Sequence, residues 1–441
     1  MASKQDLKQL ACLAIEARAN ELIKISQTIL SNPETGYRET KTSALVADWF
    51  QSAGLRHRKG IAKTGIVAEI ESGKPGHTVA VFGELDSLIV PGHAFADARS
   101  GAAHACGHHI QIGSMLGVAV GLLAPGVLEA LSGRVKLMAV PAEEGIEIEH
   151  RLTLRDSNEI EFISGKQEFV RLGEMDHVDI AMMTHASTYE PYGFGMYEMN
   201  GNVKKNFHFI GHAAHAGSQP EQGINALNAA ALAISAIHAQ RETFRDKDNV
   251  RVHPIITRGG SAVNSVPADV RMETYVRASN MDALKDAAAK VDRAVRAGAM
   301  AVGAKVRIIT VAGTLPSRWD QSLAKVWSGN AAALVGPGEI RNRTFSGGST
   351  DMGDISHLIP SIHPFVYAAT GTGHGADYLV KDYHLAVIKS AQAMAMTVID
   401  LLGDGGAEAA EVARKFKPSM SRADYLTLLR AFATDRTYAD S

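Results

Sequence analysis

The chain has 441 residues, of which 46% are hydrophobic and 21% charged, and its formal net charge is −2. This length allows two domains with a sizeable core, and the near-neutral charge without a Lys/Arg-dense run disfavours a nucleic-acid partner. Two cysteines, Cys12 and Cys106, are too few for a disulfide framework. The charged N-terminal ten residues do not resemble an export signal, and no long uncharged apolar run predicts a membrane span, so we expect a cytoplasmic protein.

Strands and helices alternate in the first part of the chain. Apolar residues at helical spacing predict helices over 5–30, 41–53 and 113–123. Short apolar runs predict strands over 65–70, 78–83, 135–140 and 179–184. This alternation predicts an α/β fold with a mixed, largely parallel sheet and flanking helices, in which polar residues at strand ends build the site.

The middle of the chain has a different order of elements. We predict strand 203–210, helix 222–240, strands 251–259 and 268–278, helix 281–300 and strand 304–311. This β-α-β-β-α-β order is typical of a ferredoxin-like α+β domain. It divides the chain into a discontinuous larger domain (1–198 and 314–405), an inserted domain (199–313) and a C-terminal tail (406–441). The larger domain resumes with strand 365–369 and helix 384–402.

Two short segments, HACGHH (104–109) and PAEE (141–144), are the most informative about chemistry. They place metal-ligand residue types near two adjacent carboxylates, one of which can bind a metal while the other faces the water that the metal activates. A lone Cys-x-His is more often a packed core pair, but five residues of ligand type at turns and strand ends favour one divalent metal site. The candidate ligands are Cys106, His108, Glu144, His185 and His374.

Two further carboxylates are candidates for supporting roles. Glu143 is the candidate general base, which would take a proton from the activated water and hand it to the leaving nitrogen. Considered alone, Glu143 could equally be a surface carboxylate at a strand end. Asp86 could accept the N–H of a ligand imidazole and fix its tautomer, although a turn or helix-capping aspartate is nearly as good an explanation.

Polar residues of the middle region are candidates for substrate contact. His215 could donate to a developing oxyanion, and Asn264 could hydrogen-bond a carboxylate or carbonyl. Arg277 and Arg343 could each hold a carboxylate. Each has a commoner explanation, namely a loop histidine, a turn asparagine and solvated arginines. The segment GTGHGA (371–376) lacks the acidic residue that a dinucleotide-binding fingerprint requires, so nucleotide binding is disfavoured.

Eight motifs spread over nearly the whole chain together resemble the M20 metallopeptidase family, in its amidohydrolase branch, subfamily D. The nearest resemblance is to the group of the aminobenzoyl-glutamate hydrolase B subunit, through GGSTDMGDIS and the shape of 211–227. The motifs are GELDSL (83–88), HACGHH (104–109), PAEE (141–144), THA (184–186), GHAAHAGSQPEQGINAL (211–227), GGSAVNSVPADVRMETYVR (259–277), GGSTDMGDIS (347–356) and GTGH (371–374).

The resemblance implies a metal-bearing α/β domain and a smaller lid domain through which the chain forms homodimers or higher homo-oligomers. It implies one or two divalent ions per subunit, with Mn²⁺ expected first and Zn²⁺, Co²⁺ or Ni²⁺ as alternatives. By position, it implies the same five ligands and Glu143 as the base. It also implies that His215 and Asn264 reach substrate in the site of the partner subunit.

Three departures from the family pattern stand out. His109 replaces the Asp or Asn of many relatives, which makes it a candidate for altering metal occupancy or substrate polarity. Glu144 and His185 are further apart than usual because of a charged insertion (147–164), expected to line the pocket or an oligomer contact. Glu84 occupies the place of a ligand histidine of other M20 branches, which weakens a two-metal assignment.

The predicted function is metal-dependent hydrolysis of a C–N bond in a small aromatic or N-acyl amino-acid amide that bears a carboxylate. Two alternatives stay open. The same site could remove an amino group hydrolytically from an activated aminobenzoate such as 5-nitroanthranilate, as in a nitroanthranilate aminohydrolase that this group resembles. The chain could also be an inactive binding subunit, although five ligand-type residues argue against it.

Overall fold

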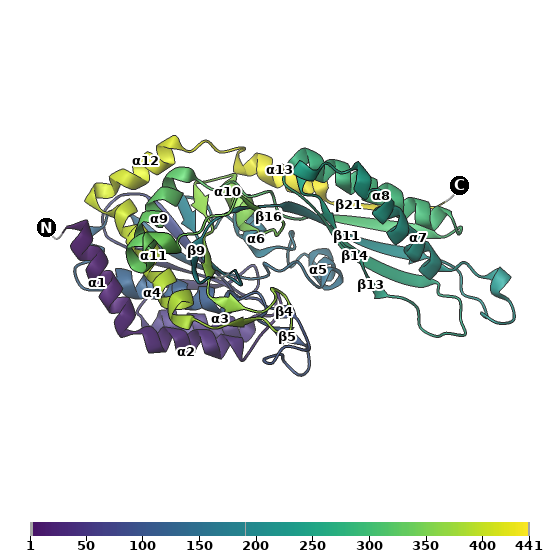
Figure 1. Cartoon of the computed structure of the whole chain (residues 1–441), viewed down its shortest axis with the longest axis horizontal. Helices are drawn as coiled ribbons and strands as arrows, with labels where there is room; N and C mark the ends of the chain where they lie inside the picture. Colours follow the sequence, from purple (N-terminus) through teal and green to yellow (C-terminus); the bar gives the residue numbers. More distant parts are fainter. Residues whose placement is uncertain (1–2, 190, 440–441) are drawn as a thin grey trace.

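The computed structural model describes residues 3–189 and 191–439. Figure 1 shows a larger α/β domain that contains the N-terminus and a smaller domain that extends from one side of it. We call the smaller domain, from Gly201 to Ala312, the lid.

The larger domain is built on a six-stranded sheet with the order β1-β2-β6-β3-β7-β17. Strands β6, β3, β7 and β17 pair in parallel. At one edge, β2 pairs antiparallel with both β6 and β1. Strand β3 is buried over its whole length, as expected of an apolar run covered on both faces. The predicted fold class is therefore confirmed. The strands are β1 (His57–Ile61), β2 (Gly65–Glu71), β3 (Thr78–Glu84), β6 (Arg134–Val140), β7 (Ile180–Met182) and β17 (Ser361–Ile362).

Helix α4 lies between the sheet and an outer layer of helices. It is buried all round, and it contacts β3 as well as the outer helices. It begins at His108, five residues before the predicted start, because the polar residues of its first turn hide the helical pattern. The predicted helix over 5–30 is in fact two helices that meet at Arg18. These helices are α1 (Lys4–Ala17), α2 (Ala19–Leu30), α4 (His108–Leu122) and α11 (Ser390–Leu402).

One helical stretch, His384–Leu402, is long and apolar enough to cross a membrane by length and composition. In the structure 83% of it is buried, and it packs against α1, α4 and α9 (Gln321–Val335). It is therefore a core helix of the larger domain.

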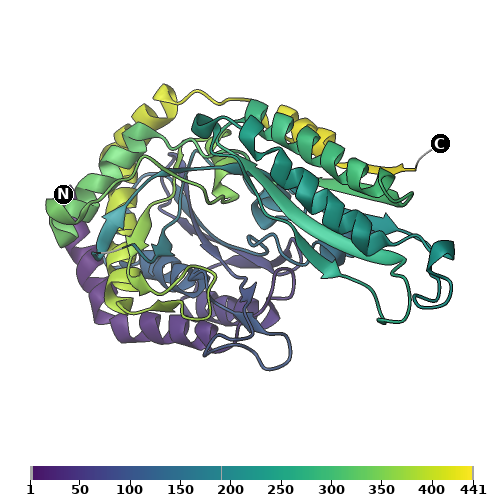
Figure 2. The same cartoon turned by 45° about the vertical axis from the view of Figure 1, so that its right-hand side comes forward.

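The lid has the predicted β-α-β-β-α-β order, with its second strand split into two pieces. Its sheet is antiparallel, and α7 and α8 cover one face, as Figures 1 and 2 both show. Side chains alternate between the helix-covered face and a face directed toward the larger domain. The elements are β11 (Gly201–Ile210), α7 (Ala226–Ala239), β12 (Arg251–Val252), β13 (Ile255–Arg258), β14 (Asp269–Ala278), α8 (Met281–Met300) and β15 (Lys305–Ala312).

The segment that we predicted as a separate tail instead joins the two domains. Helix α12 (Ala407–Lys415) packs against α11, and α13 (Arg422–Phe432) buries Tyr425 and Leu429. Strand β21 (Thr434–Tyr438) then pairs antiparallel with β15 of the lid, so the two termini lie at opposite ends of the molecule (Figure 1). Its sequence TDRTY has no apolar pattern that would have predicted a strand.

The insertion also contacts the lid. It contains α5 (Ile148–Asp156), and three of its side chains, Ile148, Leu152 and Ile163, form a buried cluster with two residues of β15. The carboxylate of Glu149 accepts hydrogen bonds from Arg271 at 3.1 Å. The insertion therefore packs against the lid sheet and does not line the cavity described below.

A buried ammonium group connects three segments beneath the site. Lys166, in α6 (Gly165–Arg171), is completely buried, and its Nζ lies 2.5 Å from both Glu84 Oε1 and Asp351 Oδ1. Glu84 ends β3, and Asp351 precedes α10 (Met352–Ser356). Burial alone would raise the pKa of Glu84, but the charges of Lys166 and His108 outweigh it and the pKa is lowered.

We predict that Lys166→Met lowers the free energy of unfolding by about 3–5 kcal/mol, because it leaves two buried carboxylates without their shared cation. Denaturant unfolding measures the loss. Lys24→Met, at an exposed position of α2, is the control and should change stability by about 0.5 kcal/mol or less. Equal stability of the two variants would contradict a structural role for the buried ammonium.

We also predict that ending the chain after Ala433, which removes β21, speeds hydrogen exchange of backbone amides in β15 by about tenfold or more. The strand would lose its hydrogen-bonded neighbour on one side. Amides of β3 in the larger domain serve as the internal control. Unchanged protection of β15 would show that β21 does not stabilise the lid.

Candidate metal centre

The turn before α4 directs two candidate ligands toward one point. Gly107 adopts a left-handed conformation with φ of 92°, and a Cβ there would lie 2.5 Å from the Tyr378 hydroxyl. Only glycine fits both constraints. The Nδ1–H of His108 donates to the carbonyl of Asp86 at 2.9 Å, which leaves Nε2 for a metal. His185, the first residue of β8 (His185–Ser187), has Nδ1 at 2.6 Å from the Ala186 carbonyl, so its Nε2 is also available.

The two glutamates lie in the loop after β6. Asp86 accepts a hydrogen bond from the backbone N–H of Glu144 at 2.9 Å, so one aspartate contacts both the glutamate loop and the histidine turn. Ala142 has a positive φ of 55°, which shows that the backbone bends sharply just before the carboxylates. His374 lies in the loop between β19 (Ala369–Thr370) and β20 (Leu379–Val380).

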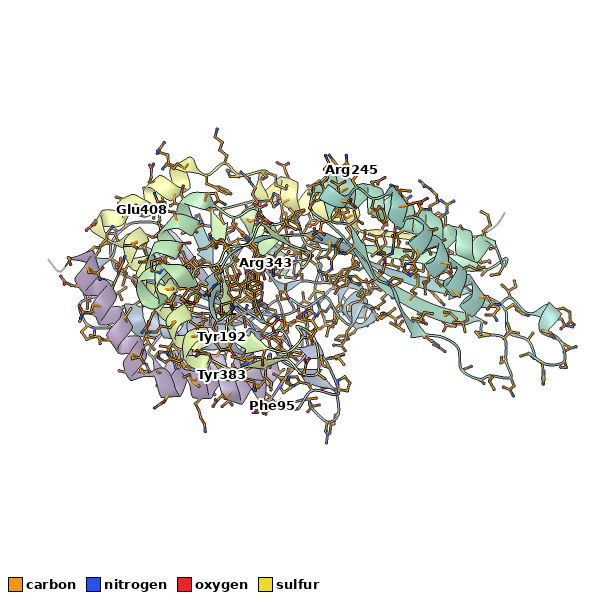
Figure 3. All side chains as sticks on the ribbon, viewed as in Figure 1. Phe95, Tyr192, Arg245, Arg343, Tyr383 and Glu408 are labelled. Carbon is orange, nitrogen blue, oxygen red and sulfur yellow. The ribbon has the colours of Figure 1, made fainter. Side chains whose placement is uncertain are left out.

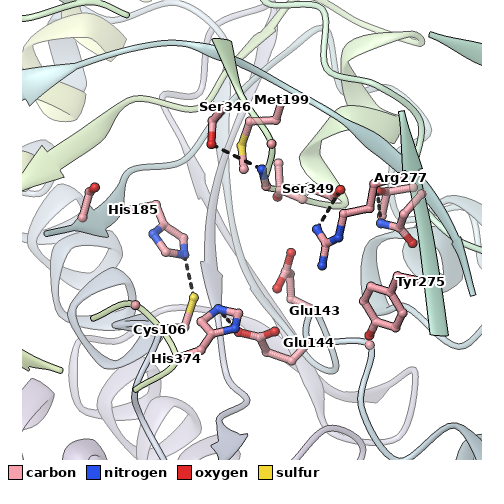
Figure 4. A pocket seen from close by; sticks show the side chains of 18 of the residues that line it. Cys106, Glu143, Glu144, His185, Met199, Tyr275, Arg277, Ser346, Ser349 and His374 are labelled. Carbon is pink, nitrogen blue, oxygen red and sulfur yellow. Dashed lines mark hydrogen bonds and ion pairs between the residues drawn. The ribbon is translucent and has the colours of Figure 1, made fainter. Parts of the chain in front are cut away.

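The structure brings all five predicted ligands together. Figure 4 shows four of them, Cys106, Glu144, His185 and His374. Cys106 Sγ lies 3.4 Å from His185 Nε2, and His374 Nε2 lies 3.6 Å from Glu144 Oε1. Two donor groups result, Cys106–His108–His185 and Cys106–Glu144–His374, and in each the donor atoms lie within 4.8 Å of one another. Cys106 belongs to both groups, so two ions bound there would share its thiolate.

The unpaired donor atoms fit a metal. Among the described residues, Glu84 Oε2, His108 Nε2 and Glu144 Oε1 are buried without a hydrogen-bond partner. Burial and the charge of His108 lower the pKa of His185 to about 4, so its imidazole is neutral, as a metal requires. Burial and the charge of Glu144 raise the pKa of Cys106, so metal binding must displace its proton.

Glu143 lies beside this set and outside both donor groups. Its carboxylate is 3.9 Å from His108 Nε2, and its side chain is 11% exposed. Burial and the charges of Glu84 and Glu144 raise its pKa well above the ordinary value. Glu84, His108 and Glu143 form a third close group, but Lys166 already neutralises Glu84.

The candidate ligands open into a cavity of about 540 Å³ between the larger domain and the lid. In Figure 4, His185 lies on one side of Glu143 and Glu144, and Tyr275 and Arg277 of β14 lie on the other. Arg277 donates to Ser349 Oγ at 2.9 Å. The cavity wall also contains lid residues that the sequence analysis did not single out, namely Lys204, Arg251, His253 and Tyr275.

The larger domain contributes an aromatic part of the wall. Tyr197 and Phe365 are stacked, with ring centroids 4.1 Å apart, and both line the cavity. Arg343, labelled in Figure 3, does not line the cavity. Its guanidinium lies over the rings of Tyr189 and Tyr197.

Besides Arg343, the predicted site residues His109, His215 and Asn264 lie away from this cavity. His215 and Asn264 are exposed on the lid, where His215 Nδ1 accepts hydrogen bonds from the backbone N–H groups of Gly217 and Ser218. His109 is buried, and its Nε2 lies 3.1 Å from the hydroxyl of Tyr383, labelled in Figure 3. Burial and the charge of His108 lower its pKa to about 3. The structure therefore places His109 behind the cavity, where it holds α4 against the Tyr383 segment.

Comparison with known proteins agrees with this architecture. Residues 197–301 match the family model of the peptidase dimerisation domain, which covers most of the lid and suggests a homodimer. The chain is 28% identical to an Xaa-Arg dipeptidase of Mus musculus over 90% of this chain and 89% of that protein. It is 32% identical to one of the subunits of the p-aminobenzoyl-glutamate hydrolase of Escherichia coli over 49% of this chain and 48% of that protein.

A solved structure shows the same fold. A dinuclear metal-binding peptidase of the M20 family from Bacillus subtilis superposes with a TM-score of 0.63 at 21% identity, covering 88% of this chain and 99% of that one. The matched dimerisation domain, the relatives that span most of the chain and the shared fold lead to one conclusion: the chain is homologous to the hydrolases of the M20 peptidase family.

Proposed function

We propose that the protein is a metal-dependent amidohydrolase that cleaves the C–N bond between a small aromatic or acyl group and an amino acid with a free carboxylate. The observation that carries the proposal is the position of Glu143, which faces the cavity beside five metal-ligand side chains and belongs to neither principal donor group. A carboxylate so placed remains free to move a proton.

A divalent ion, expected to be Mn²⁺, would polarise the scissile carbonyl and lower the pKa of a water molecule in this site. Glu143 accepts the proton of that water and passes it to the leaving nitrogen. Its raised pKa suits the second step, because the carboxyl group must hold the proton before it passes it on. The positive charge of a bound ion would lower this pKa and favour the carboxylate that the first step needs. Asp86 keeps His108 and the backbone of Glu144 in place during the reaction.

The cavity wall supports this class of substrate. The stacked rings of Tyr197 and Phe365 suit a planar acyl group. On the lid side, Arg277 is the candidate partner for the carboxylate. His215 and Asn264 remain predicted to serve the site of a partner subunit, which their exposure on the lid permits.

The aromatic part of the wall also favours a second candidate, hydrolytic deamination of an activated aminobenzoate. Attack of water at an electron-poor ring carbon uses the same base. Incubation of the Mn²⁺-loaded protein with N-aroyl amino acids and with aminobenzoates distinguishes the two, because the first reaction releases an amino acid and the second releases ammonia.

We predict that Glu143→Gln lowers turnover by about 10²–10⁴-fold and leaves metal content unchanged, because the amide cannot accept the proton. Amide hydrolysis and elemental analysis of the purified variant measure the two quantities. Glu129→Gln, at an exposed position outside the cavity wall, is the control. Near-normal turnover of Glu143→Gln would remove the assignment of the base.

We predict that the metal-free protein binds two Mn²⁺ per chain and that Cys106→Ala weakens both binding steps by at least about tenfold, because Cys106 belongs to both donor groups. Calorimetric titration measures this without turnover. The other cysteine provides the control, since Cys12→Ala lies outside the site. Weakening of only one step would show that the thiolate does not bridge.

A further inference from the structure

The insertion buries a guanidinium group beside the glutamate loop (141–145). Arg151 of α5 is completely buried and is among the largest fully buried side chains of the protein. Its Nη1 donates to the backbone carbonyl of Ile163 at 2.8 Å and to that of Ala142 at 3.3 Å. Ala142 immediately precedes the two glutamates of the metal centre. The insertion therefore makes a direct contact with the loop that carries the candidate base.

Ala142 has a backbone conformation that needs support from its surroundings. Its φ of 55° lies in the left-handed region, which is unfavourable for a residue with a Cβ. Its N–H donates to Glu39 Oε1 at 2.8 Å, and its carbonyl accepts from Arg151 and from the N–H of Gly165 at 3.4 Å. Without these partners Ala142 could relax, and the two glutamates that follow would point elsewhere.

The charge of Arg151 has no counterion of its own. Among residues 3–189 and 191–439, no carboxylate lies within 4.0 Å of its guanidinium, and its Nε and Nη2 have no hydrogen-bond partner. The ring of Tyr37, whose centre lies 5.5 Å from Cζ, offers only partial compensation. An unpaired buried charge lowers stability, and a methionine could fill similar space without it. Packing alone therefore does not explain an arginine at this position.

The surrounding chain is shaped to admit this guanidinium. A Cβ at Gly36 would collide with Nη2 and would lie 2.8 Å from Ala142 Cα, so glycine there lets the side chain reach the loop. The charge is also felt in the cavity, because burial and the charge of Arg151 lower the pKa of Lys204 to about 8. Lys204 lines the cavity, whereas Arg151 itself does not.

We infer that Arg151 is a positioning residue of the metal centre, which fixes the carbonyl of Ala142 and thereby directs Glu144 toward the metal ligands and Glu143 toward the cavity. The inference rests on the proposed function for the role of Glu143, whereas metal binding alone tests the role of Glu144. The insertion then belongs to the working site although it does not line the cavity.

Calorimetric titration of the metal-free protein with Mn²⁺ tests the positioning of Glu144 without turnover. We expect Arg151→Met to weaken Mn²⁺ binding by about 10–100-fold, as typically follows when a group that orients a ligand is lost. Arg151→Lys should restore part of the affinity, because its ammonium can still donate to the carbonyl. The control Arg155→Met removes a guanidinium that pairs with Asp156 on the same helix, and it should bind Mn²⁺ like the parent protein.

Parent affinity in a folded Arg151→Met would overturn the inference. Should Arg151→Met not fold, Arg151→Lys keeps the buried charge and decides: weaker Mn²⁺ binding than in the parent supports the positioning role, and parent affinity contradicts it.

Hydrogen exchange distinguishes positioning from a general loss of structure. Backbone amides of residues 142–145 should exchange about tenfold or more faster in Arg151→Met, while those of β3 keep the protection of the parent protein. Faster exchange throughout the larger domain would show that Arg151 only stabilises the fold, and the positioning role would be rejected.

Turnover of N-aroyl amino acids separates this inference from the proposed reaction. At saturating Mn²⁺, kcat of Arg151→Met should fall about tenfold or more with KM changed by less than about twofold, because Arg151 does not line the cavity. Weakened Mn²⁺ binding in the variant with no amide hydrolysis by the parent would keep the positioning role and reject the amidohydrolase assignment. Hydrolysis by the parent with unchanged kcat and unchanged Mn²⁺ binding in Arg151→Met would reject the positioning role alone.

Discussion

The arrangement of the site depends on one buried ammonium group. Lys166 neutralises Glu84 at the end of β3 and Asp351 at the start of α10, and the other oxygen of Glu84 lies 3.1 Å from His108 Nε2. Unpaired charges in such an interior would be very costly, so these segments can pack together only with the cation between them. The lysine lies two residues after the insertion (147–164). The insertion therefore contacts the lid, and the helix that follows it supports the candidate metal centre.

The two domains contribute different physical properties to the cavity. The larger domain supplies the candidate metal ligands, the base and an aromatic surface, whereas the lid supplies positive charge. Under the proposed function, the ligands and the base carry out the reaction, and the lid residues contact the amino-acid half of the substrate. This division allows the chemistry to stay constant while substitutions on three lid strands change the substrate.

Much of the fold and of the candidate site could be predicted from residue types and spacing. The ligands Cys106 and His374 are far apart in sequence, but both follow short strands, and loops at strand ends meet at one edge of a sheet. The lid was predictable because its strands and helices have clear periods. The start of α4 at His108 was missed because His108 and His109 stand where the first turn of a helix would carry apolar residues.

Other features depend on contacts that no local pattern encodes. Lys204 is a lysine in an otherwise buried strand, and only the sheet register shows that it and Arg277 share the cavity face while Lys205 points the other way. Lys166 follows a charged stretch of the sequence, so nothing local indicates that its side chain is buried. The sequence signal for Lys204 was a charged residue within an apolar strand. Whether such a residue has an ion-pair partner depends on tertiary packing.

Strand β21 gives the lid sheet two unlike edges. One edge of the sheet is β21 itself, a five-residue strand that contains Asp435 and Arg436. The opposite edge includes β13, where Ile255 is 61% exposed. Short charged edges resist pairing, and apolar ones favour it. If two copies joined their lid sheets through β13, the apolar edge of each would be covered and only the charged β21 edges would stay exposed. Sheet extension would then stop at a closed pair and would not continue into a filament.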